Sequence, residues 1–138
     1  MKKIVVPAEK ENLNKILELS HEVLSKIKNL EEKTILNIDL VIEEIFVNVA
    51  CYAYPEKKDG TVTIMCSIED ETFIIEFIDK GVKFNPLENN EPDITLDAEK
   101  RKAGGLGIFL AKKLTDKIHY FYKNNENHLI LEKNLKMT

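Results

Sequence analysis

The sequence predicts an α+β protein, a two-layer sandwich in which helices cover one face of a mostly antiparallel sheet. Helical and strand periodicities occur in the order β-α-α-β-β-loop-α-β-β, which separates the helices from the strands. The chain has 138 residues, 43% of them hydrophobic, which is enough for a full core without metal or disulfide crosslinks. We therefore expect a single domain over residues 1–138.

The first half of the chain is predicted to be helical after one short strand. Residues 4–6 are β-branched and are followed by Pro7, a pattern typical of a strand that stops at the proline. Apolar residues then recur at three-and-four spacing over residues 13–27, which predicts an amphipathic helix. From about residue 31 to residue 54 they cover more than one stripe, so this second helix should lie centrally and contact several elements.

The second half is predicted to contain two β-hairpins separated by a long loop and a short helix. Residues 61–68 and 72–78 either alternate between apolar and polar or are continuously apolar, and charged residues separate them. This pattern predicts a β-hairpin with a charged turn. Residues 82–103 lack periodicity, and a loop of that length is usually functional or mobile. A short helix should end at Leu114, and the last hairpin should pair residues 118–123 with 129–131 around a turn at 124–127.

Charge and composition narrow the range of functions. The net charge of −4 provides no global field that would attract nucleic acid or an anionic membrane, so we expect neither as a direct partner. Apolar stretches such as residues 47–53 end well before the ~20 residues that a membrane span needs, and the N-terminus lacks a signal-peptide core. Cys51 and Cys66 fit neither a metal pair nor a disulfide framework. These features predict a cytoplasmic protein.

Two polar residues interrupt the apolar pattern of the second helix. Glu44 and Asn48 are four residues apart, so they lie one above the other on the same helix face. A buried carboxylate or amide without a partner costs about 1–3 kcal/mol, so both would need partners in the fold. The alternative, which spacing alone favours, is that both point to water at the helix edge.

Asp79-Lys80-Gly81 follows directly after an apolar strand. A carboxylate only accepts hydrogen bonds, so Asp79 at the strand end suits an amino group such as that of adenine. Gly81 would allow a tight turn and the approach of a flat ligand. The alternative interpretation is an ordinary Asp-x-Gly turn.

A glycine-rich segment precedes the short helix. Gly104, Gly105 and Gly107, with Leu106 between them, expose backbone N–H groups beside a helix N-terminus, which favours anion binding. The basic residues 100–102, Arg101 among them, would help to neutralise a polyphosphate; the alternative is a solvated charge run.

Taken in order, these three motifs resemble those of the GHKL ATPase superfamily, whose members have the Bergerat ATP-binding fold. Residues 44–48 are similar to its N-box, residues 79–81 to its first glycine box, and residues 104–107 to its second. Within that superfamily, residues 79–87 and 104–108 look most like those of bacterial anti-sigma factor serine kinases. The resemblance covers nearly the whole chain, from Ile4 to about Lys133.

The resemblance implies a catalytic role and a set of ligand contacts. Glu44 would be the general base, and Asn48 would be the protein's oxygen ligand to Mg²⁺. Asp79 would accept from the adenine amino group, and Gly81 would pass beneath the base. The remaining ATP-binding positions would hold phosphate under a lid formed by about residues 88–103, and they are Arg101, Gly104, Gly105, Leu106 and Gly107.

The implied function is that of an ATP-dependent serine-protein kinase and anti-sigma factor. Its partners would be a small anti-sigma-factor antagonist, a sigma factor and a second copy of the chain. Alternatives are a non-catalytic ATP-dependent switch module and a stand-alone histidine-kinase ATPase domain, although no helix with a phosphoacceptor histidine precedes the site. The chain departs from the pattern at Lys83, where a second glycine is common, and at Ile130, which is aligned with a threonine near the base.

Overall fold

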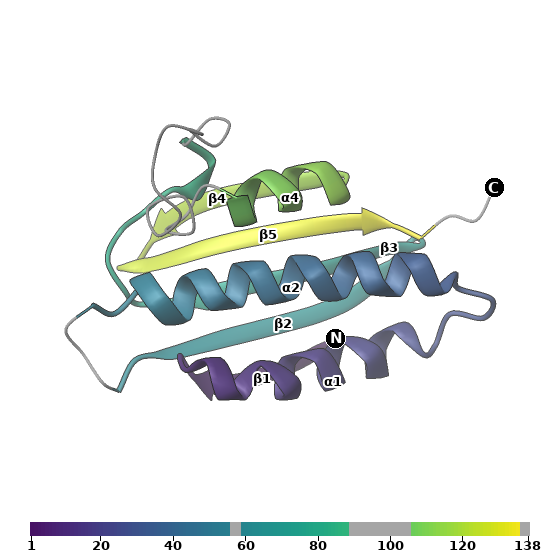
Figure 1. Cartoon of the computed structure of the whole chain (residues 1–138), viewed down its shortest axis with the longest axis horizontal. Helices are drawn as coiled ribbons and strands as arrows, with labels where there is room; N and C mark the ends of the chain where they lie inside the picture. The colour runs from purple at the N-terminus through teal and green to yellow at the C-terminus, as the bar shows by residue number, and fades with distance from the viewer. Residues whose placement is uncertain (56–58, 89–105, 136–138) are drawn as a thin grey trace.

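A computed structural model describes residues 1–55, 59–88 and 106–135 of the chain. In these residues a five-stranded sheet has the order β1-β2-β3-β5-β4, and every neighbouring pair is antiparallel. Helices α1, α2 and α4 lie together on one face of it (Figure 1). The elements in chain order are β1 (Lys2–Pro7), the 3₁₀ turn η1 (Lys10–Asn12), α1 (Leu13–Leu24), α2 (Glu32–Tyr52), β2 (Thr61–Glu69), β3 (Thr72–Asp79), the 3₁₀ turn η2 (Pro86–Glu88), α4 (Leu106–Leu114), β4 (Lys117–Lys123) and β5 (Glu126–Asn134). The predicted two-layer α+β sandwich is confirmed.

The hydrophobic core lies between the helices and the sheet. Alternate residues of β2, β3 and β5 point toward the helices, and Phe77 on β3 is 1% exposed. Helix α2 contributes the fully buried Ile42 and Phe46 and lies between α1 and α4 (Figure 1). Burying a side chain of this size stabilises the fold by about 1.5–3 kcal/mol. The central position expected for the second helix is therefore confirmed.

Both hairpin turns are shorter than the sequence pattern predicts. Asn124 and Asn125 have φ angles of 54° and 62°, as a two-residue turn with both central residues in the left-handed region requires. Asparagine tolerates that region, so β5 begins at Glu126 rather than at residue 129. The predicted turn over 124–127 is wrong at its last two positions. Asn127 is therefore a strand residue with a defined side-chain direction.

The long loop predicted for residues 82–103 is described only as far as residue 88, and that part contains η2. The expected lid, Arg101, Gly104 and Gly105 lie outside the described residues. Among the helices that the structure describes, none combines the length and the apolar character needed to cross a membrane.

Candidate functional site

A cleft of about 390 Å³ opens among α2, the adjoining ends of β3 and β5, residues 82–86 and α4. This volume is in the range of small-molecule sites. Its described walls are mainly apolar, and the apolar side chains include those of Ile45, Val49, Phe77, Val82, Phe84, Ile108 and Leu129. The polar side chains that line it include those of Asn48, Asp79, Lys83, Tyr120 and Asn127. The cleft therefore combines mainly apolar walls with a small set of polar groups.

Asn48 and Glu44 occupy different positions relative to this cleft. Both are half-buried on α2, one turn apart. Asn48 lines the cleft, whereas the described lining does not include Glu44. The structure thus places Asn48 in the wall of the cleft and the Glu44 carboxylate one helical turn from Asn48.

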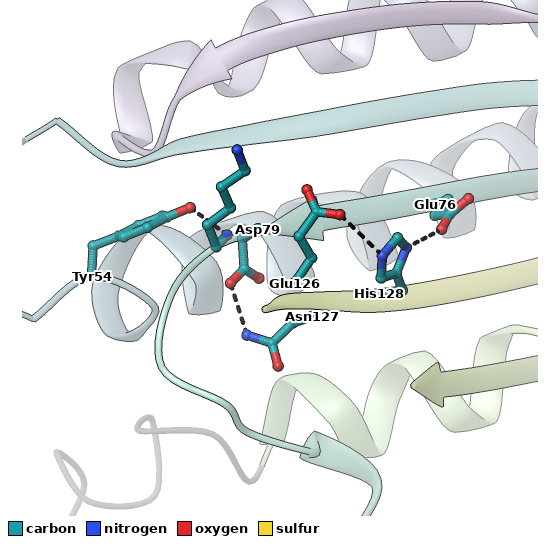
Figure 2. A network of polar contacts seen from close by, with 7 residues as sticks. Tyr54, Glu76, Asp79, Glu126, Asn127 and His128 are labelled. Atoms are coloured by element: carbon teal, nitrogen blue, oxygen red, sulfur yellow. Dashed lines mark hydrogen bonds and ion pairs between the residues drawn. The ribbon is translucent and has the colours of Figure 1, made fainter. Parts of the chain in front are cut away.

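Asp79 is the last residue of β3 and is 7% exposed. Its Oδ1 atom accepts a hydrogen bond from the Gly81 N–H at 2.9 Å. It also accepts one from Asn127 Nδ2 at 2.9 Å (Figure 2). Burial raises the pKa of the Asp79 carboxyl, and the two N–H donors and nearby His128 act in the opposite direction. In the described part of the chain the hydrogen bonds to this carboxylate converge on Oδ1, which leaves Oδ2 for a ligand in the cleft.

Gly81 packs against the end of α2. A Cβ atom at this position would lie 2.1 Å from the carbonyl oxygen of Ala53, so only glycine fits. The same oxygen accepts a hydrogen bond from the Val82 N–H at 2.8 Å. The Tyr54 hydroxyl accepts one from the Lys80 N–H at 2.7 Å. The described cleft lining does not include Gly81, so what it contributes here is the close junction of α2 with β3.

Sequence reasoning missed Asn127. It is 7% exposed and is the pairing partner of Asp79 across β3 and β5. Ile130, the position aligned with a threonine near the base, pairs instead with Glu76. Side chains alternate along a strand, so Ile130 points to the opposite face of the sheet and its predicted place near the base is wrong. The sequence carries no local signal for Asn127, because the identity of the four polar residues 124–127 does not show which of them turn the chain.

The second glycine motif is described only in part. Leu106 and Gly107 form the first turn of α4, and Ile108 lines the cleft. The N-terminus of α4 therefore lies beside the cleft, and the N–H groups and dipole of a helix N-terminus favour an anion.

Comparison with known families agrees with this geometry. Residues 6–133 match the family model described as the histidine kinase-like ATPase domain. The chain belongs to this family. The resemblance to GHKL ATPases and the Bergerat-type fold predicted from the motifs are both confirmed.

Curated relatives of this ATPase domain include serine-protein kinases. This chain is similar to the serine-protein kinase RsbW of Listeria monocytogenes and to that of Listeria innocua, each 27% identical over 95 residues. Each alignment covers 65% of this chain and 60% of the relative. The chain thus aligns with somewhat more than half the length of these kinases.

Solved structures show the same fold at low sequence identity. The RsbU and RsbW domains of Rv1364c from Mycobacterium tuberculosis match with a TM-score of 0.67 and 14% identity, over 100% of this chain and 34% of that one. The catalytic domain of histidine kinase ThkA matches with a TM-score of 0.57 and 14% identity, over 98% of both chains.

Proposed function

We propose that this ATPase domain binds Mg-ATP in the cleft and transfers the γ-phosphate to a serine of a small anti-sigma-factor antagonist. The observation that carries the proposal is the placement of Asp79, Asn48 and the N-terminus of α4 around one apolar cleft. The serine-protein kinases among its relatives support the choice of acceptor. As in an anti-sigma factor, the chain would also bind a sigma factor in the cytoplasm, as a dimer of two copies.

The apolar part of the cleft suits the adenine ring. Ile45 and Val49 from α2 and Leu129 from β5 provide apolar contacts, and Asp79 supplies an acceptor in the same cleft. An ionised carboxylate favours a donor such as the 6-amino group of adenine. Adenosine would therefore occupy the end of the cleft formed by β3 and β5.

The phosphates would extend toward Asn48 and α4. Asn48 offers one oxygen ligand, and Mg²⁺ commonly takes one or two protein oxygens and completes its shell with phosphates and water. The described residues contain no cluster of three acidic, histidine or cysteine side chains that would hold a metal alone, which fits an ion that arrives with the nucleotide. When bound, Mg²⁺ would neutralise charge on the phosphates.

Glu44 would act on the incoming serine rather than on the nucleotide. Its position, one turn from Asn48 and outside the described cleft lining, suits a base that meets a hydroxyl from a docked partner. Glu44 would accept the hydroxyl proton while the serine oxygen bonds to the γ-phosphorus. The bond from that phosphorus to the β-phosphate oxygen breaks, and ADP leaves.

The test is incubation of the protein with Mg-ATP and the antagonist encoded nearest to it, with intact mass as the measurement. We expect one phosphate to be added to the antagonist. Glu44→Ala should abolish this transfer but retain ATP binding, and Asn48→Ala should lose the Mg²⁺ dependence of ATP affinity. Glu43→Ala is the matched control, because Glu43 is an exposed glutamate on the same helix.

If the antagonist binds but gains no phosphate, and Glu44→Ala still regulates the sigma factor, the protein is a non-catalytic switch module and not a kinase. If ATP does not bind at all, both the kinase and the ATP-dependent switch module are rejected.

A further inference from the structure

The hydrogen-bonding capacity of the buried Asn127 side chain is fully used. Its Nδ2 group donates to Asp79 Oδ1 and to the Val82 carbonyl oxygen, each at 2.9 Å. Its Oδ1 atom accepts from the Phe84 N–H at 3.2 Å and from the Tyr120 hydroxyl. An asparagine amide offers two donors and two acceptor sites, so none remains for a ligand. Asn127 therefore acts through its neighbours.

Two of these neighbours fix the orientation of the amide. The Phe84 N–H can only donate and the Val82 carbonyl can only accept, so the amide cannot be reversed without losing both bonds. Reversal would also place the amide oxygen against the Asp79 carboxylate. The segment after β3 thus holds Asn127 with its N–H toward Asp79.

This orientation determines what Asp79 offers to the cleft. Asn127 and the Gly81 N–H both donate to Oδ1, and hydrogen bonds to the charged form of a carboxylate favour that form. Burial of Asp79 works against ionisation, and the two donors oppose this effect and favour the carboxylate as an acceptor. A protonated carboxyl would lose the preference for an amino group, because its O–H is itself a donor.

We infer that Asn127 is a positioning residue that makes Asp79 select a base with an exocyclic amino group. The inference rests on the proposed ATP site. It concerns base specificity and not phosphoryl transfer, because Asn127 is paired with Asp79 and not with Glu44 or Asn48.

The experiment compares ATP with purine riboside triphosphate, which carries hydrogen in place of the 6-amino group. Calorimetry would give the ratio of the two affinities for the wild type and for the matched variants Asn127→Thr and Asn127→Val. The two variants have the same shape and both lose the amide contacts to Val82 and Phe84, and only the threonine keeps a donor near Asp79. Thermal unfolding would be measured alongside.

We expect the wild type to bind ATP about 10- to 100-fold more tightly than the analogue, as loss of a hydrogen bond to a charged group predicts. Asn127→Val should lower this ratio to within about threefold of unity, and Asn127→Thr should restore most of it, directly or through one water. If Asn127 had a purely structural role, each variant would lose affinity for ATP and for the analogue by the same factor. The affinity ratio would then be the same in Asn127→Val and Asn127→Thr.

Equal ratios in the wild type and Asn127→Val would overturn the inference, and so would a wild type that bound both nucleotides equally. If Asn127→Val does not fold, the smaller pair Asn127→Ser and Asn127→Ala makes the same comparison. A wild type that bound neither nucleotide would reject the proposed ATP site, and the inference with it. ATP binding with an unchanged ratio would reject the inference alone.

Discussion

Asp79→Asn should weaken ATP binding without weakening the fold. The substituted amide would keep its oxygen toward the Gly81 N–H and the Asn127 Nδ2 group, because both are donors. Its own NH₂ group would then replace Oδ2 and face the adenine amino group, so that donor would meet donor. Loss of a hydrogen bond to a charged group costs about 1.5–3 kcal/mol, so the Kd for ATP should rise about 10- to 150-fold.

The stability of the same variant follows from the pKa of Asp79. Burial raises the pKa of this carboxyl above its ordinary 3.8, so the folded state binds the proton more tightly than the unfolded state does. The contribution of Asp79 to stability is therefore full below pH 3.8 and is lost as pH rises through the folded pKa. At about pH 7 Asp79→Asn should unfold at the same temperature as the wild type or a higher one, and this advantage should shrink on acidification.

Calorimetry with ATP and thermal melts across pH make the two measurements. Glu76→Gln is the control, because Glu76 lies on β3 three residues earlier and bonds to His128 on the face of the sheet away from the cleft (Figure 2). It should leave ATP affinity unchanged. Unaltered ATP affinity in Asp79→Asn, or an equal loss in Glu76→Gln, would refute the assignment of Asp79 as the base acceptor.

Three other changes test separate parts of the structure. Gly81→Ala should destabilise the fold by about 1–3 kcal/mol in chemical denaturation, since its Cβ would meet the Ala53 carbonyl oxygen; an unchanged midpoint would contradict this packing. Burial raises the pKa of the Cys66 thiol to about 12, whereas Cys51 is exposed, so a thiol reagent should modify one cysteine in the native protein and both after unfolding. Lys83 is the only cation in the described cleft lining, so Lys83→Met should weaken ATP more than adenosine, and equal losses would count against a phosphate contact.

The fold could be predicted from the sequence because each element has a clear hydrophobic period. The stripes of α1 and α2 and the alternation in β2 and β3 are local signals, and the structure repeats them within a few residues at each end. The ends of the last hairpin were less predictable. Four polar residues stand between the apolar runs, and their identity does not show that only Asn124 and Asn125 turn the chain.

The candidate site was predictable only in so far as its residues belong to local motifs. Asp79 and Asn48 are marked by polar residues in apolar segments, and both line the cleft. Asn127 became visible only through strand register, which joins residues 48 positions apart. The packing of Gly81 against Ala53 is a tertiary contact that no local spacing encodes.

The junction between α2 and β3 also sets how the site responds to a ligand. Val82 bonds to Ala53, and Tyr54 bridges Lys80 and the carbonyl oxygen of Thr61, so the end of the helix and the end of the strand form one rigid unit. Asn48 lies on α2 and Asp79 ends β3, so the spacing between the Asn48 amide and the Asp79 carboxylate is set when the chain folds. Little conformational entropy remains to be lost there on binding. Free and nucleotide-bound protein should accordingly show the same rate of hydrogen exchange at the Lys80 and Val82 amides.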